Sequence, residues 1–318
     1  MERLKRNLAL ALALGAAVYL GLAVVSGFGS VASALDNFNL ALVPLILGLV
    51  LLSYAGRFVR WLYYLKILKV SVPLSTNAAI FASGLSMTIS PGKLGEVLKS
   101  VFVRQASGAA VARTAPAVVA ERATDGTGMV AWGFLGAFAL GLAPGTMVVF
   151  LAVAALGIAV LRSKRLSLLV ERALLKLPLL KRLAPHLEDF HASSNELLGT
   201  RPLVVGTAIS FLAWGLECLA VYLCAVGLDA NLAFLLVVFV FATSSLVGVL
   251  SMLPGGIGAV EAGLTGQFVA IAGLSTGVAV ALTLIIRLAT LWFATLVGII
   301  GLFAVRALLG NASITPEP

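Results

Sequence analysis

Charged side chains stand at several positions inside or beside the long apolar stretches of this sequence. They comprise the cations Lys93, Lys99, Arg122 and Arg287 and the acids Glu96, Glu121, Asp125, Glu217 and Glu261. A charge at the bilayer centre costs about 2.5 to 3.5 kcal/mol on insertion scales, so each requires a partner or water. The near balance of charge predicts mutual pairing around a shared polar cavity, where an arginine fork could bind two oxygens of a phosphate.

Two interpretations of these charges are open. Structural ion pairs could lock neighbouring helices together, or the side chains could face a cavity and bind a substrate. Both stay open for Glu121, Arg122 and Asp125, which lie close to one end of their apolar stretch. Lys99 could also extend its stem to the membrane interface. Substrate binding is the favoured interpretation for Lys93, Glu96, Glu261 and Arg287.

Two proline-glycine motifs accompany these charges: "PGKLGEV" at 91–97 and "PGGIGAV" at 254–260. Pro91 and Pro254 lack a backbone N–H and suit the first turn of a helix, and Ser90 can cap the first of these helices. The glycines that would let a backbone or ligand approach closely are Gly92, Gly95, Gly255, Gly256 and Gly258. We therefore expect two helices to begin inside the membrane, each presenting unpaired N–H groups that attract an anion such as phosphate.

The surroundings of the two motifs also repeat in order. Runs of small residues precede them, "FASGLSMTIS" from 81 and "FATSSLVGVLSML" from 241, and "ERAT" at 121 or "RLAT" at 287 follows. An odd number of predicted crossings separates the copies, so the second would be inserted upside down. Such inverted repeats with broken helices are typical of transporters that bind substrate near the midplane.

The composition requires a membrane protein. Of 318 residues, 61% are hydrophobic and only 11% are charged. We predict an all-α polytopic fold with one domain, 1–318, built from about six full spans and two re-entrant broken elements. The full spans are placed near 8–28, 40–58, 115–140, 145–161, 203–227 and 276–305, and the broken blocks near 74–110 and 232–273. Repeat one would cover about 40–140 and repeat two about 203–305. The first span is interpreted as a retained helix.

Basic residues fall on one side of this arrangement. Arg57 stands at the end of the span at 40–58, and Arg60, Lys66 and Lys69 follow it. The amphipathic connector 162–201 is rich in lysine and arginine, whereas "SVASALDNFN" at 30–39 carries only an acid. Both termini are therefore predicted to be cytoplasmic in the cell membrane. The connector could gather anionic lipid headgroups or simply obey the charge rule, and the net charge of +9 needs no nucleic-acid partner.

Several chemistries are excluded by missing motifs. The sequence contains neither a phosphate-binding Gly-x-x-x-x-Gly-Lys-Ser/Thr loop nor a His-Glu-x-x-His motif. His186 and His191 are expected to face solvent, and Cys218 and Cys224 to pack in the core. We expect no metal, no cofactor and no enzymatic activity.

The chain resembles the lysylphosphatidylglycerol synthase transmembrane-region family, the flippase-like domain of multiple peptide resistance factors. The resemblance rests on "SPGKLGEVLK" from 90, "ERATD" from 121, "PGGIGAVEAG" from 254 and the arginine of "IIRLATLW" at 287. It implies a helical fold with two re-entrant elements that moves a polar lipid between leaflets. Full-length synthases append a soluble aminoacyl-transferase domain, whereas this chain ends at "GNASITPEP", so lipid aminoacylation is not expected.

The resulting hypothesis is a flippase or scramblase for a polar or headgroup-modified phospholipid. Lys93, Arg122 and Arg287 would hold the phosphate with the two Pro-Gly helix starts, while Glu96, Glu217 and Glu261 would balance charge or bind a cationic headgroup. Two alternatives stay open: a secondary transporter for a small anion, or a membrane subunit that positions a lipid-modifying enzyme or glycosyltransferase. Homo-oligomerisation is a further expectation that no motif specifies.

Overall fold

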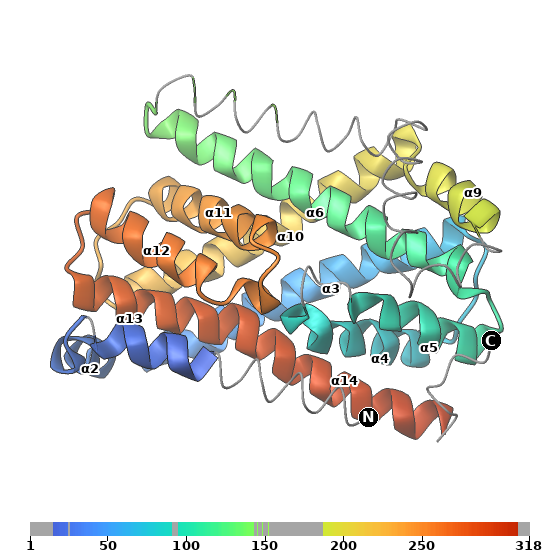
Figure 1. The fold of residues 1–318 in the computed structure, drawn as a ribbon, viewed down its shortest axis with the longest axis horizontal. Helices are drawn as coiled ribbons and strands as arrows, with labels where there is room; N and C mark the ends of the chain where they lie inside the picture. The colour runs from blue at the N-terminus through green and yellow to red at the C-terminus, as the bar shows by residue number, and fades with distance from the viewer. Residues whose placement is uncertain are drawn as a thin grey trace.

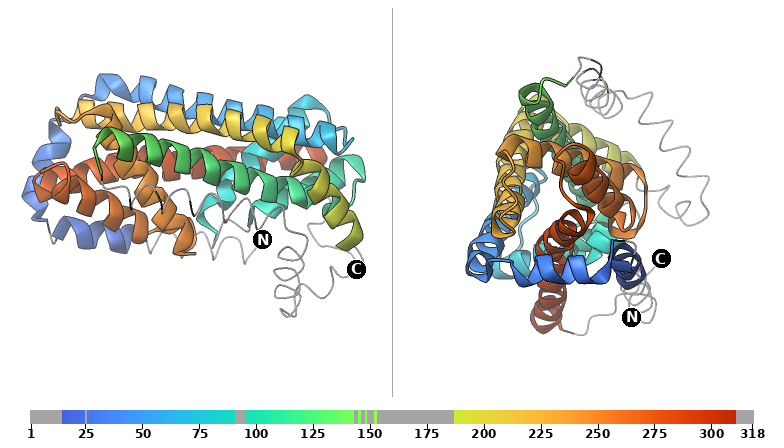
Figure 2. Two further views of the ribbon diagram at one scale, coloured as in Figure 1. Left: turned by 90° about the horizontal axis from the view of Figure 1, so that it is seen from above. Right: turned by 90° about the vertical axis from the view of Figure 1, so that its left-hand side faces the viewer.

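The computed structural model describes residues 15–24, 26–90, 95–142 and 187–310, together with Gly145, Val148 and Ala152. In these ranges the secondary structure is helical and contains no strand, as predicted. Pro91, Gly92 and Lys93 lie outside the described residues, as do most of the predicted span 145–161 and most of the connector 162–201, including His186. Most helices run roughly along the long axis of the molecule (Figure 1, Figure 2).

Three helical segments in the described ranges are long and apolar enough to cross a membrane: Leu40–Ile67, Thr200–Gly227 and Thr276–Leu309. The first consists of the short helix η1 (Leu40–Leu42) and α3 (Val43–Ile67), and the second is α10. The third contains α13 (Thr276–Arg287), a π-helical turn η6 (Leu288–Trp292) and α14 (Phe293–Leu309). Each exceeds the roughly 20 residues needed to cross about 30 Å of hydrocarbon.

Helix α6 (Val111–Ala139) occupies the predicted span at 115–140 and has 29 residues. It is long enough to cross a bilayer, but it carries Arg113, Glu121, Arg122 and Asp125, which set it apart from the three apolar helices. α6 packs against α10, α11 (Phe234–Leu250) and the short helix α9 (Leu187–Leu197). The outer surface of the bundle is apolar, with Leu212, Leu250 and Phe303 each about two-thirds exposed or more.

The beginning of the chain differs from the sequence prediction. A helix at Gly15–Val24 is followed by α2 (Phe28–Asp36), which turns away from it by 102°. The turn occurs at Gly27, whose φ of 81° lies in the left-handed region that glycine adopts without penalty. Residues 30–36 are therefore helical, although they were predicted as part of a connection between spans.

The predicted broken blocks form two helical hairpins. α4 (Leu74–Leu85) continues into η2 (Ser86–Ile89) and returns as α5 (Leu98–Ser107), and we call this segment hairpin one. α11, η5 (Pro254–Gly256) and α12 (Ala259–Ala270) form hairpin two. The hairpins lie toward opposite ends of the molecule (Figure 1), and η2 contacts η5. The two helix breaks thus meet inside the bundle, where Ile89, Ile257 and Leu291 form a small apolar cluster.

Helix α3 extends past its predicted end. The apolar span was placed at 40–58, but the helix continues to Ile67. Arg57 and Arg60 therefore lie inside the bundle, and Arg60 is fully buried, whereas the charge pattern had assigned both to a cytoplasmic connection. Lys66 and Lys69 remain exposed. The ends of α3, α5 and α14 gather with α9 at the same end of the molecule (Figure 1).

Candidate functional site

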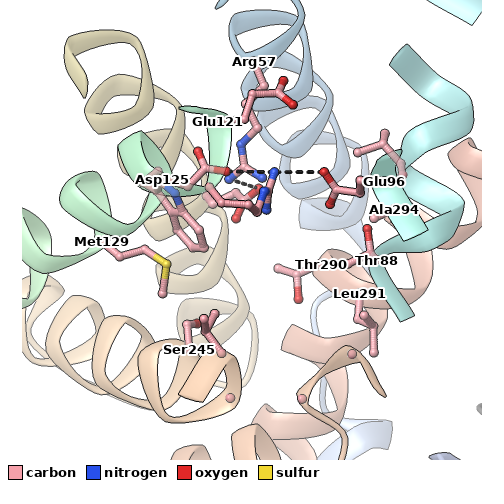
Figure 3. A pocket seen from close by; sticks show the side chains of 18 of the residues that line it. Arg57, Thr88, Glu96, Glu121, Asp125, Met129, Ser245, Thr290, Leu291 and Ala294 are labelled. Atoms are coloured by element: carbon pink, nitrogen blue, oxygen red, sulfur yellow. Dashed lines mark ion pairs between the residues drawn. The ribbon is translucent and has the colours of Figure 1, made fainter. Parts of the chain in front are cut away.

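A cavity of about 270 Å³ lies where the two hairpins meet. Its wall is formed by α3, hairpin one, α6, α10, hairpin two and the turn η6, so both halves of the sequence contribute. Charged side chains occupy one part of the wall, and Met129, Ser245, Thr290 and Leu291 line another (Figure 3). The charged lining residues are Arg57, Arg60, Glu96, Lys99, Glu121, Arg122, Asp125, Glu217 and Arg287.

Hairpin one and α6 share a network of ion pairs. Arg122 lies 3.1 Å from Glu96 and 3.1 Å from Asp125. Lys99 pairs with Glu121, lies 3.9 Å from Glu96 and stands 4.5 Å from the centroid of the Trp61 ring. Lys99 is almost completely buried, so its ammonium does not extend to the membrane interface. The sequence prediction that these charges pair around a shared cavity agrees with this geometry.

The two arginines of α3 join the same network. Arg60 donates to Asp125 at 2.7 Å and to Thr124 at 3.0 Å. Arg57 lies 2.9 Å from Glu217 of α10 and 4.8 Å from the centroid of the Trp214 ring. Sequence reasoning missed both arginines as site residues. The signal for them is the apolar run "WLYYL" directly after Arg60, which indicates that the helix continues.

A separate ion pair joins hairpin two to the end of α13. Arg287 donates to Glu261 at 2.6 Å and to the Gly255 carbonyl at 2.7 Å. The other carboxylate oxygen of Glu261 accepts from the Gly258 N–H at 2.7 Å, which caps the start of α12. The Glu261 carboxylate thus accepts the hydrogen bond of an N–H group that was predicted to face an anion. Arg287 and Glu261 lie with the Pro254 break, while Arg122 belongs to the network of hairpin one.

Hydrogen bonds also order the break in hairpin one. Ser90 donates from its hydroxyl to the Met87 carbonyl at 2.6 Å and accepts from the Gly95 N–H at 2.9 Å. The Ser90 side chain therefore satisfies a donor across the break, in the manner of a helix cap. In hairpin two, Gly255, Gly256 and Gly258 have φ values of 61°, 65° and 92°, so the turn requires residues without a side chain.

Several buried nitrogen atoms at the cavity have no hydrogen-bond partner within the described part of the chain. They are Arg57 Nε, Arg60 Nε and Nη2, Arg122 Nε and Trp214 Nε1. All four side chains line the cavity. An unsatisfied buried donor costs about 1 to 3 kcal/mol, so the wall is suited to an acceptor-rich ligand or to water.

The apolar part of the wall reaches the outer surface of the bundle. Val249 and Leu253 line the cavity, yet they are 51% and 42% exposed. They stand beside Leu250 and Met252, which are also exposed. The rim of a charged cavity therefore adjoins an apolar outer surface, an arrangement suited to a molecule with a polar head and apolar tails.

The described residues contain no cluster of three or more His, Cys, Asp or Glu side chains that could hold a metal ion. Cys218 and Cys224 are buried and not joined in a disulfide.

Comparison with known proteins agrees with this membrane architecture. A UPF0104 membrane protein of Pyrococcus horikoshii is 28% identical over 283 residues, covering 80% of this chain and 84% of the relative. UPF0104 membrane proteins of Methanothermobacter thermautotrophicus are 34% identical over 120 residues and 36% identical over 92 residues. These matches cover 37% and 29% of this chain but only 35% and 27% of the archaeal relatives' own length.

The family described as lysylphosphatidylglycerol synthase TM region matches residues 8–298. That range includes both hairpins, the cavity and every predicted site residue. This chain is therefore a membrane protein of the lysylphosphatidylglycerol synthase TM region family.

Proposed function

We propose that this chain is a flippase or scramblase that moves a polar or headgroup-modified phospholipid between membrane leaflets. The observation that carries the proposal is the charged cavity whose apolar rim reaches the outer surface at Val249 and Leu253. A lipid could place its headgroup among the charges while its tails stay in the bilayer. The family relationship supports a lipid-related role for a membrane domain of this kind.

We further propose that the two hairpins belong to an inverted repeat. They enter from opposite ends of the molecule, and their breaks touch at η2 and η5 (Figure 1). Irregular backbone at this depth is tolerated where protein or a polar cavity surrounds it. Rocking of one half against the other would expose the cavity first to one leaflet and then to the other.

The headgroup phosphate would bind first at Arg122, which has a partly exposed side chain, and at Arg57, which lines the same cavity. Lys99, Lys93 and the helix breaks would contribute positive potential, with Glu96, Glu121, Asp125 and Glu217 balancing the cations. Because Glu261 already pairs with Arg287 and caps α12, Arg287 would reach a phosphate only if that pair opened. This places Arg287 in a gating role during translocation.

The same proposal includes the setting of the protein. The chain would reside in the cell membrane with both termini cytoplasmic, because exposed Lys66 and Lys69 lie at the end of the molecule to which α5 and α14 also run. Anionic headgroups would surround that end. The chain would carry out no chemical reaction and need no cofactor, and it could act as a homo-oligomer or beside a separate lipid-modifying enzyme.

Reconstitution into vesicles with fluorescent phospholipids tests the proposal. A membrane-impermeant quencher should reach more label than in protein-free vesicles, and Arg122→Gln should remove most of that increase. Arg104→Gln, at an exposed position of α5, serves as the matched control and should leave the increase intact.

Loss of the increase in Arg104→Gln as well as Arg122→Gln, or no increase with the folded wild type, would refute lipid movement through this cavity. Uptake of a small inorganic anion without lipid movement would favour the secondary-transporter alternative. Co-purification of a lipid-modifying enzyme or glycosyltransferase, without lipid movement, would favour the membrane-subunit alternative.

A further inference from the structure

Among the described residues, the buried polar atoms of the cavity wall that lack a hydrogen-bond partner are mostly nitrogens, with Asp125 Oδ2 as the carboxylate oxygen among them. Arg57, Arg60, Arg122 and Trp214 each leave at least one buried N–H-bearing atom without a partner among the described residues. These atoms come from α3, α6 and α10, and Arg60 and Trp214 are more than nine-tenths buried. The excess is therefore a property of the assembled wall rather than of one side chain.

Each acid of the wall, in contrast, lies within ion-pair distance of a cation; Asp125 Oδ2, which has no hydrogen-bond partner among the described residues, lies 3.1 Å from Arg122. Glu96 lies 3.1 Å from Arg122, Asp125 lies 2.7 Å from Arg60, and Glu217 lies 2.9 Å from Arg57. Glu121 pairs with Lys99. An incoming ammonium group would have to displace one of these cations, which would leave that cation buried without a partner.

We propose that the headgroup bound in this cavity is a phosphate ester without an amine. Resting on the proposed lipid translocation, this inference assigns the substrate class of the same site. Phosphate and hydroxyl oxygens would accept from Arg57 Nε, Arg122 Nε and Trp214 Nε1, while Arg60 holds Asp125 in position. The apolar rim at Val249 and Leu253 receives the acyl or prenyl chains.

Native mass spectrometry of the purified full chain tests this selectivity without requiring transport. The protein is offered equal amounts of phosphatidylglycerol, phosphatidic acid, phosphatidylethanolamine and lysyl-phosphatidylglycerol with identical acyl chains. The first two should be retained about tenfold over the two amine-bearing lipids, as expected from one unmatched buried polar group. Equal or preferential retention of the amine-bearing lipids would overturn the inference.

A pair of tryptophan variants localises the effect. Trp214→Phe removes one donor but keeps an aromatic ring beside Arg57, and it should weaken retention of the amine-free lipids about five- to tenfold. Trp132→Phe is the matched control, because its indole nitrogen donates to the Phe211 carbonyl away from the cavity. Equal retention by the two variants, with wild-type unfolding temperatures, would refute the assigned site.

The result separates the two proposals. If amine-free lipids are retained selectively but no lipid moves in vesicles, the headgroup assignment stands and translocation falls. If lipids move but amine-bearing headgroups are preferred, translocation stands and this assignment falls. Displacement of bound lipid by millimolar inorganic phosphate would identify a free anion as the ligand and overturn the lipid form of the inference.

Discussion

Both hairpins carry a Pro-Gly motif in their sequence, but their charged side chains pair differently. In hairpin one, Glu96 and Lys99 pair with Glu121 and Arg122 of α6, and that network continues to α3 and α10. In hairpin two, Glu261 caps its own helix and pairs with Arg287. Hairpin one therefore contributes to a shared, partly unsatisfied wall, whereas the acid of hairpin two is held by the start of its own helix α12 and by Arg287 at the end of α13. The repeated sequence motif is thus not accompanied by equivalent ion pairs.

Breaking the Glu261–Arg287 ion pair should have the largest effect on stability. Glu261→Ala leaves Arg287 buried beside the Gly255 carbonyl and removes the cap of α12, so we expect a loss of about 3 to 5 kcal/mol. Thermal unfolding in detergent measures it. Glu121→Gln should cost less, because Lys99 retains Glu96 at 3.9 Å.

Asp36→Asn, at an exposed acid of α2, is the control for these substitutions. If Glu261→Ala unfolds at the same temperature as Asp36→Asn, the Glu261–Arg287 pair does not contribute to stability and does not fix hairpin two to α13.

The packing seam between hairpin one and α14 should be next in size. A Cβ added at Gly298 would clash with the Ser86 backbone nitrogen, so Gly298→Ala forces α14 away from η2. We expect about 1 to 3 kcal/mol of destabilisation, measured by chemical unfolding. Gly48→Ala in α3 meets nothing within 4 Å and should be neutral or slightly stabilising. Equal stability of the two variants would show that this seam is not tightly packed.

Much of the backbone arrangement could be predicted from sequence because it depends on local signals. Apolar length predicts the helices, and the Pro-Gly motifs predict both broken blocks. The 102° turn at Gly27 was missed, since a single glycine in a small-residue run carries little signal. The end of α3 was misplaced because the charge rule treats every arginine near a span end as exposed.

The site was predictable only in part. Its charged members stand out because charge is rare in such a sequence, and their pairing follows from the cost of burial. Which acid meets which base could not be predicted, because Arg60 and Asp125, or Arg57 and Glu217, are brought together only by helix packing. Trp214 resembles any core aromatic until its unpaired nitrogen is seen at the cavity wall.

A smaller effect is expected where α3 touches the second half. The Tyr54 hydroxyl donates to the Thr290 carbonyl at 3.2 Å, within the π-helical turn after Arg287. Tyr54→Phe should cost about 1 kcal/mol in the free energy of unfolding, because one buried carbonyl loses its side-chain donor. Tyr63→Phe is the control and should leave stability unchanged, because the Tyr63 hydroxyl makes no side-chain hydrogen bond within the described part of the chain. Equal free energies of unfolding for the two variants would show that the Tyr54–Thr290 hydrogen bond does not stabilise the contact between α3 and the second half.

The smallest expected effect lies inside hairpin two. Thr243 donates to Gln267 at 2.8 Å, and Gln267 donates to Ser244 at 3.0 Å, so polar contacts join α11 to α12. A double-mutant cycle with Thr243→Val and Gln267→Leu should give a coupling near 0.6 kcal/mol, the average for such bonds between membrane helices. The matched cycle uses Thr127 and Thr207, which meet at 3.1 Å between α6 and α10. If the coupling in hairpin two is the larger, contacts between α11 and α12 hold this hairpin together locally. If the α6–α10 coupling is larger, the difference between the two hairpins is confined to their ion pairs and does not include their uncharged hydrogen bonds.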